Sequence, residues 1–151
     1  MYEKYDILHQ RTCVETPQQN VVGERKHQHI MNVTCSLLFQ SGLSKIYWSY
    51  VASHVTHLIN RLPSKILKGK SPYEMLYCQP PTYLNLKTFG CLCFASTLEN
   101  NRSKLVPRSR KSVFIGYKTG IKGYVLLDVK NREIFINEKM LSFMKIFFLT
   151  I

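Results

Sequence analysis

The residue pattern of this chain changes near Leu86, and this change limits its fold more than any other feature. Before Leu86, apolar residues recur at the spacing of an α-helix, whereas short β-type runs separated by Gly, Asn and Pro follow it. A chain of 151 residues can form one ordinary domain or two small ones. We therefore expect an α+β fold, with a mainly helical domain at residues 1–86 and a small antiparallel β-barrel or sandwich at residues 87–151.

The first helix is predicted to begin near Val22. Residues at three- and four-residue spacing indicate a buried stripe on one side of it. The stripe comprises Ile30, Val33, Leu37 and Ser41. Gly42 is a typical C-terminal stop, and Glu24 lies on the side opposite the stripe, so it should face outward. Upstream, residues 5–10 predict a short strand and residues 11–20 a polar loop.

Two further helices are predicted before the pattern changes. The second should follow Ser44, a suitable N-cap residue, and end before Pro63. Its apolar side comprises Ile46, Tyr47, Tyr50, Val51, His54, Leu58 and Ile59. The third is short and should begin at Pro72, because Ser71 and Glu74 have the spacing of a capping box.

The second part of the chain contains four β-type runs, at residues 89–95, 113–117, 124–129 and 133–136. Lys130-Asn131 predicts a tight hairpin between the last two runs. From about Asn137 the sequence is apolar without a helical or β-type pattern. It predicts no regular structure there.

The cysteines and histidines give little indication of a metal site. An odd set of five cysteines without paired spacing indicates a reducing compartment. Cys91 and Cys93 alternate within an apolar run and should share one face of a strand, and zinc would need two further ligands. His54 and His57 lie three residues apart, which favours the edge of a helix contact over metal ligation. No segment has the length of a membrane helix, so we expect an intracellular protein without a membrane partner.

The chain is basic, and its charge is unevenly distributed. It carries 21 Lys and Arg against 9 Asp and Glu, a formal charge of +12, which favours nucleic acid as the partner. Residues 1–86 contribute 9 cations and 5 acids, whereas residues 87–151 contribute 12 and 4. Much of the excess of cations in residues 87–151 lies in a predicted loop that comprises Arg102, Lys104, Arg108, Arg110 and Lys111. Such a loop is either a solvated connection or an arm that contacts phosphates.

Several short motifs follow one another between residues 16 and 136. They are Thr16-Pro17-Gln18-Gln19-Asn20, Glu24-Arg25-Lys26-His27, Tyr47-Trp48, Leu58-Ile59-Asn60-Arg61-Leu62-Pro63, Gly69-Lys70-Ser71-Pro72-Tyr73-Glu74, Phe89-Gly90-Cys91, Phe114-Ile115-Gly116-Tyr117 and Lys122-Gly123-Tyr124. In this order they resemble the integrase region of copia-type retrotransposon Pol polyproteins, over roughly four fifths of the chain. The resemblance implies a fold: the C-terminal fragment of a ribonuclease H-like catalytic core, followed by an SH3-like barrel.

The resemblance also implies a chemistry, in which two Mg²⁺ or Mn²⁺ ions held by two Asp and one Glu cut and join DNA. Glu24 matches the third acid, and it would bind metal only if other chains supplied the missing acids. Asp6 is the only Asp upstream of it and lies too near. The family pattern has Gly directly after Asn20, whereas this chain has Val21 there and Gly23 just before Glu24. One carboxylate cannot hold two hard cations, so we expect a catalytically inactive fragment without a cofactor.

Three functional hypotheses remain open. The chain is an inactive integrase fragment linked by ancestry to DNA integration, a non-enzymatic DNA- or RNA-binding module, or a protein-interaction or non-functional relic. The residues predicted to contact nucleic acid, most readily DNA in the nucleus, are Asn20, Arg25, Lys26, His27, Lys70, Arg102, Lys104, Arg108, Arg110 and Lys111. The predicted helices require a sheet to pack against, so we expect this part to expose apolar surface or to associate with itself or another integrase-like chain.

Overall fold

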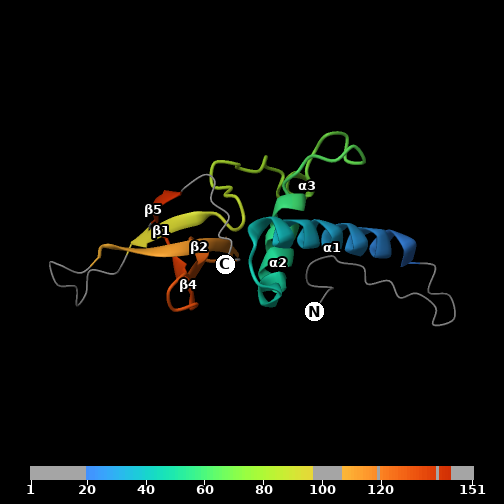
Figure 1. Cartoon of the computed structure of the whole chain (residues 1–151). Helices are drawn as coiled ribbons and strands as arrows, with labels where there is room; N and C mark the ends of the chain where they lie inside the picture. The colour runs from blue at the N-terminus through green and yellow to red at the C-terminus, as the bar shows by residue number, and fades with distance from the viewer. Residues whose placement is uncertain (1–19, 97–106, 119, 139, 144–151) are drawn as a thin grey trace.

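A computed structural model describes residues 20–96, 107–118, 120–138 and 140–143 of the chain. Helices come first and an antiparallel sheet follows, so the fold is α+β (Figure 1). The elements are α1 (Val21–Ser41), η3 (Lys45–Tyr47), α2 (Trp48–Ile59), α3 (Pro72–Tyr77), β1 (Leu92–Ser96), β2 (Ser109–Tyr117), β3 (Tyr124–Asp128), β4 (Ile134–Asn137) and β5 (Met140–Phe143). The strand expected at residues 5–10 and the loop expected at residues 11–19 lie outside the described residues.

Helix α1 matches the prediction at both ends. It begins one residue before Val22, and Gly42 ends it in the left-handed conformation at φ 65°, where its N–H donates to the carbonyl of Phe39. The predicted stripe faces the core, because Ile30, Val33 and Leu37 pack against a buried cluster and Ser41 is buried. By contrast, residues 20–29 are all exposed. The first turns of α1 therefore extend beyond α2 (Figure 1).

The second predicted helix is shorter than expected. Ser44 precedes a 3-10 turn, makes no side-chain capping hydrogen bond, and is followed by Ile46 at 74% exposure. The regular helix α2 begins at Trp48 and buries Val51, His54 and Val55. The prediction that His54 lies at the edge of a helix contact is wrong, because rings of the second half of the chain cover it.

Helix α3 begins as predicted. The backbone N–H of Glu74 donates to the hydroxyl of Ser71 at 3.1 Å, and Pro72 occupies the first turn. The backbone N–H of Tyr73 also donates to the carbonyl of Asn60 at 2.8 Å. This bond fixes the start of α3 against the end of α2.

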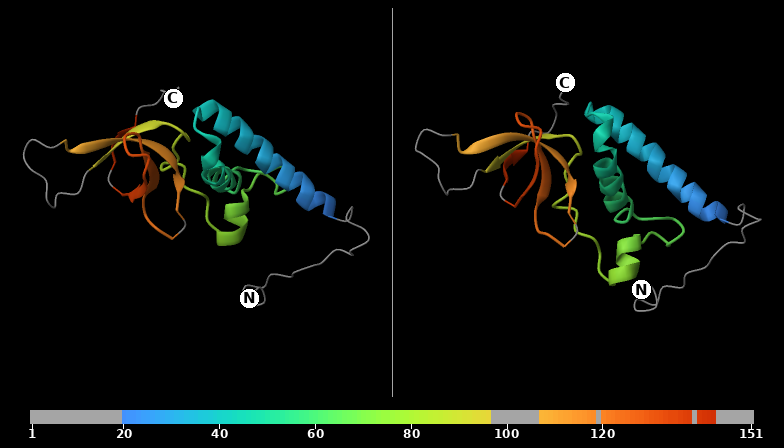
Figure 2. Two further views of the ribbon diagram at one scale, coloured as in Figure 1. Left: turned by 60° about the horizontal axis from the view of Figure 1, so that its bottom comes forward. Right: turned by 90° about the horizontal axis from the view of Figure 1, so that it is seen from below.

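The five strands form one antiparallel sheet in the order β4-β3-β2-β1-β5. Strands β4 and β5 are its two edges, yet only residues 138 and 139 separate them in sequence. The sheet must therefore curl until its edges approach each other. A hydrogen bond at 2.8 Å from Asn137 Nδ2 at the end of β4 to the carbonyl of Ser96 at the end of β1 joins the two sides. The expected small β-barrel is thus present in nearly closed form (Figure 2).

The strands differ from the predictions at four places. β1 begins at Leu92 and not at residue 89, because Phe89 and Gly90 lie in a turn. β2 begins at Ser109, so Arg110 and Lys111 lie on a strand and not in a loop. The turn after β3 is longer than the predicted two-residue hairpin, because Asp128 Oδ1 accepts the N–H groups of Lys130 and Asn131 and the chain reverses through Arg132 at φ 57°. β5 pairs with β1 where the sequence predicts no strand. Its apolar sequence has no alternation, and the pairing of β5 depends on the sheet curling back.

Two buried clusters divide the core. The first includes Val51 and Val55 of α2 together with Val113, Ile115 and Leu127 of the sheet. Helix α2 packs against both α1 and β2, so the helices cover one outer face of the barrel (Figure 2). The second half of the chain therefore supplies part of the sheet that the helices require.

The second cluster fills the inside of the barrel. It comprises Cys91, Cys93, Ala95, Phe114 and Leu126. Cys93 lies in β1 and Cys91 directly before it, and both enter this cluster, as expected for alternating positions. Burial raises the pKa of their thiols to about 11 and about 12. Both thiols are therefore protonated at neutral pH and act as small apolar groups.

Large apolar side chains remain exposed in the helical part. Examples are Phe39 at 76%, Ile66 at 92% and Leu84 at 85%. The expectation that this part exposes apolar surface is confirmed. No helix in the described ranges combines the length and hydrophobicity needed to span a membrane.

Candidate nucleic-acid interface

Glu24 lies in the first turn of α1 and its side chain is exposed. Asn20 precedes the helix, and Arg25, Lys26 and His27 follow on exposed positions. A carboxylate in the first turn is favoured by the helix dipole whatever else it binds. In the part of the chain that the structure describes, no three His, Cys, Asp or Glu side chains gather closely enough to hold a metal ion. The described residues thus do not fit a two-metal centre.

A second group of predicted cations lies on the barrel. Arg108 is in the bend before β2, and Arg110 and Lys111 are in β2 itself; all three side chains are exposed. Arg110 opposes Ala95 and Lys111 opposes Phe94 in the β1–β2 pairing, so the two cations point to opposite faces of the sheet. Arg102 and Lys104 lie outside the described residues.

The predicted cations do not form one surface. The start of α1 and the start of β2 lie at opposite ends of the molecule in all three views (Figures 1 and 2). Lys70 is exposed in a closed loop before α3, in which the N–H of Ser64 donates to the carbonyl of Lys70. The described residues of the predicted nucleic-acid set therefore lie in three separate places.

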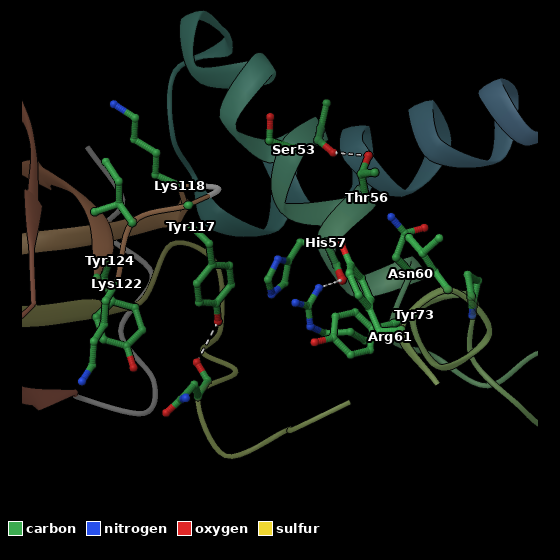
Figure 3. A pocket seen from close by; sticks show the side chains of 18 of the residues that line it. Ser53, Thr56, His57, Asn60, Arg61, Tyr73, Tyr117, Lys118, Lys122 and Tyr124 are labelled. Atoms are coloured by element: carbon green, nitrogen blue, oxygen red, sulfur yellow. Dashed lines mark hydrogen bonds between the residues drawn. The ribbon is translucent and has the colours of Figure 1, made fainter. Parts of the chain in front are cut away.

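A wide groove lies between the helices and the barrel, and no pattern in the sequence predicts it. Its volume is about 1360 Å³. One wall is formed by the second half of α2 and by α3, and the other by the end of β2, the β2–β3 connection and the start of β3 (Figure 3). Three cations line it, Arg61 on the helical wall and Lys118 and Lys122 on the opposite wall, against one acid, Glu138, among the described lining residues.

Arg61 is held in place on the helical wall. Its Nη1 donates to the carbonyl of His57 at 3.0 Å, and its guanidinium lies over the ring of Tyr73 at 4.9 Å (Figure 3). The ring of Tyr73 in turn contacts that of Tyr77 at 4.6 Å. This wall therefore presents a cation and two aromatic rings side by side.

Tyr117 is fixed in a similar way on the barrel wall. Its hydroxyl accepts the N–H of Lys87 at 2.7 Å and donates to the carbonyl of Asn85 at 3.0 Å. Its ring stacks on that of His57 at 4.3 Å between centroids. Burial raises the pKa of Tyr117 to about 12, so the hydroxyl keeps its proton.

His57 is neutral at pH 7. Burial, and then the nearby charge of Arg61, lower its pKa to about 4. The cationic character of the groove therefore comes from Arg61, Lys118 and Lys122 alone among its described lining residues. A metal shared by His54 and His57 would have no third ligand in the described ranges.

The sequence does not predict the groove, because its two walls come from segments far apart in the chain. Arg61 lies in the motif that ends α2, and Tyr117 and Lys122 lie in motifs of the barrel. The motifs identify these residues individually. No local signal says that the segments meet.

Comparison with known proteins confirms the resemblance to copia-type Pol polyproteins over most of the chain. Residues 91–141 match the retroviral polymerase SH3-like domain. The chain is 36% identical over 132 residues to the retrovirus-related Pol polyprotein from transposon RE2 of Arabidopsis thaliana, covering 87% of this chain and 9% of that protein. It is 34% identical over 136 residues to the protein from transposon RE1 of the same plant, covering 90% of this chain and 9% of that protein.

A third relative comes from another plant. The retrovirus-related Pol polyprotein from transposon TNT 1-94 of Nicotiana tabacum is 34% identical over 130 residues, which is 86% of this chain and 10% of that protein. The chain thus spans about a tenth of the length of these relatives. No solved structure shows significant similarity to the chain.

Proposed function

Because the chain is homologous to a segment of Pol polyproteins from copia-type retrotransposons, we propose that it is an integrase-derived segment that binds nucleic acid, DNA in the nucleus foremost, without cutting or joining it. In this proposal residues 1–86 descend from the C-terminal part of a ribonuclease H-like integrase core. Residues 87–151 descend from the barrel domain that follows it, and the match over residues 91–141 supports this assignment.

The exposed cations at the start of β2 carry the proposal. Arg108, Arg110 and Lys111 form no ion pair in the described part of the chain, so their charges are available to phosphates, although the guanidinium of Arg110 also lies over the ring of Phe135 at 5.9 Å. The backbone of Arg110 and Lys111 is held in place by pairing with β1. Cations on a fixed backbone bind phosphates with a smaller loss of conformational freedom than cations on a loose loop.

Salt-dependent binding to duplex DNA tests the proposal. In the variant Arg108→Ala/Arg110→Ala/Lys111→Ala, the slope of log affinity against log salt should become less steep by up to about 2.7, since each phosphate contact contributes about 0.9 to it. Lys45→Ala/Lys130→Ala, which removes two exposed cations elsewhere, is the control. Absence of any binding at low salt would refute the proposal.

The absence of catalysis is the second part of the proposal. Two metal ions require several carboxylates, and in this sequence Glu24 matches a single acid of the family set. We expect no Mn²⁺- or Mg²⁺-dependent cleavage or joining of labelled DNA. Cleavage that disappears in Glu24→Gln would overturn this part of the proposal and leave the binding part intact.

A second candidate function is association with another protein chain. It is favoured by the exposed apolar side chains of the helical part, such as Phe39, Ile66 and Leu84. The occupant would be a second copy or another integrase-like chain. Sedimentation of the chain over a range of concentrations tests association with a second copy, which a monomer at all concentrations would exclude.

A further inference from the structure

We propose that the groove between α2/α3 and the β2–β3 connection binds a single-stranded segment of nucleic acid. This inference rests on the proposed function and names the form of nucleic acid and its place. Two observations carry it, the distribution of charge in the groove and the aromatic rings on its walls.

The charges of the groove lie on both sides of its opening. Lys118 and Lys122 are exposed on the barrel wall, where their side chains extend away from Arg61, and Arg61 is half-buried on the helical wall (Figure 3). One of the five N–H donors of Arg61 is used by the carbonyl of His57, and among the described residues no other acceptor engages the guanidinium. A phosphate between the walls would therefore meet the guanidinium of Arg61 directly, and the two exposed lysines have flexible stems that can turn toward it.

The rings make the groove suitable for bases and not only for phosphates. Tyr77 lines the groove with 58% of its surface exposed, and Tyr73 lies beside it at 4.6 Å between ring centroids. Unpaired bases stack on such rings, whereas the bases of a duplex are stacked on one another and cannot reach them. The combination of cations and accessible rings thus favours a single strand.

A smaller hollow of about 230 Å³ adjoins the groove. Its walls include the Arg61–Tyr73 pair on one side and the His57–Tyr117 stack on the other, together with Asn85. It offers flat surfaces for a base and polar groups for the base edge. A base that turns out of the bound single strand would fit the chemistry of this hollow.

The groove is distinct from the cations at the start of β2. Tyr117, at the groove end of β2, is seven residues from Arg110, which corresponds to about 23 Å along a strand. Substitutions in one place therefore leave the other intact. This separation allows the two proposals to be tested independently.

The experiment compares binding of two fluorescent probes by fluorescence anisotropy, an oligodeoxythymidylate of about 12 nucleotides and a duplex of the same length. The groove variants are Tyr77→Ala and Lys118→Ala/Lys122→Ala, which alter exposed side chains. Their controls are Trp48→Ala, an exposed ring at the start of α2 that does not line the groove, and Lys45→Ala/Lys130→Ala, an equal loss of charge. Circular dichroism checks that every variant is folded.

We expect the wild-type chain to bind the single strand. Tyr77→Ala should weaken this binding about tenfold, since stacking of one base on a ring has roughly this effect. Lys118→Ala/Lys122→Ala should lower the slope of log affinity against log salt by about 1.4, as two lost phosphate contacts to a single strand predict. The controls should bind as the wild type does.

Each contrary result has a defined meaning. If the wild type fails to bind the single strand, or if both groove variants bind it unchanged, the groove assignment is wrong. When duplex binding then still depends on Arg108, Arg110 and Lys111, the proposed function stands without it. Absence of binding to both probes at low salt overturns both proposals.

Discussion

His54 is a polar side chain placed where the helices meet the barrel. It is 2% exposed, and its ring lies 5.4 to 5.5 Å from those of Phe89, Phe114 and Tyr117. Its Nδ1 is buried without a hydrogen-bond partner in the described part of the chain. Such an unsatisfied group costs about 1–3 kcal/mol, and it costs more when the ring is charged.

Acid should therefore destabilise the fold through His54. Burial, and then the charge of His57, lower its folded-state pKa from 6.5 to about 4. Between these values the unfolded chain binds more protons, so the stability is complete above pH 6.5 and falls as the pH decreases toward 4. His54→Leu should make the dependence of the unfolding free energy on pH less steep by about 1.4 kcal/mol per pH unit between these values.

Urea unfolding at a series of pH values measures this effect. The same substitution at His29, which is exposed on α1, provides the control and should leave the slope unchanged. His57, whose pKa is also lowered to about 4, contributes to the slope that remains. An unaltered slope in His54→Leu would contradict the placement of His54 in the core.

Among the elements, the end of α1 and the start of the barrel approach each other closely at Gly90. The N–H of Gly90 donates to the carbonyl of Phe114 at 2.9 Å, and its φ of 77° favours glycine. A Cβ atom there would lie 2.6 Å from Cβ and 3.2 Å from Cα of Ser41. Ser41 is itself buried, and its hydroxyl donates to the carbonyl of Leu38.

Gly90→Ala should therefore destabilise the chain by roughly 3 kcal/mol, from backbone strain and overpacking together. Gly120→Ala is a matched control, because Gly120 has the same φ of 77° and a Cβ atom there would meet nothing within 4 Å beyond its chain neighbours. The control should show the backbone strain of about 1–2 kcal/mol alone. Equal effects in thermal unfolding would mean that α1 does not contact Gly90 closely.

Over the whole molecule, the helices and the barrel share one apolar cluster. Val51 and Val55 of α2 pack with Val113 and Val125 of the sheet. Burial of this kind couples two parts of a chain, because neither can unfold without exposing apolar surface of the other to water. We therefore expect the two parts to unfold together.

The coupling can be measured by unfolding with three probes. Helix circular dichroism and the fluorescence of Trp48, at the start of α2, should be compared with the amide NMR signals of strands β2 and β3, which report on the barrel alone. Val55→Ala should move all three transitions together and lower the free energy of unfolding by about 2 kcal/mol. A barrel transition that stays in place while the helix signals shift would show two independent domains.

Features that depend on neighbouring residues follow from the sequence alone. The stripe of α1, its stop at Gly42 and the start of α3 at Ser71 result from local periodicity and capping. The burial of Cys91 and Cys93 in one cluster results from the alternation of extended chain. The motifs also suffice for the resemblance to copia-type Pol polyproteins.

Features that join segments far apart in the chain arise only in the folded molecule. The strand β5 exists because the sheet curls back to β1, and His54 is buried because rings of the barrel cover α2. The groove forms because Arg61 and Lys122 are brought to facing walls. Contacts between distant segments are set by packing of the whole chain, and no local pattern encodes them.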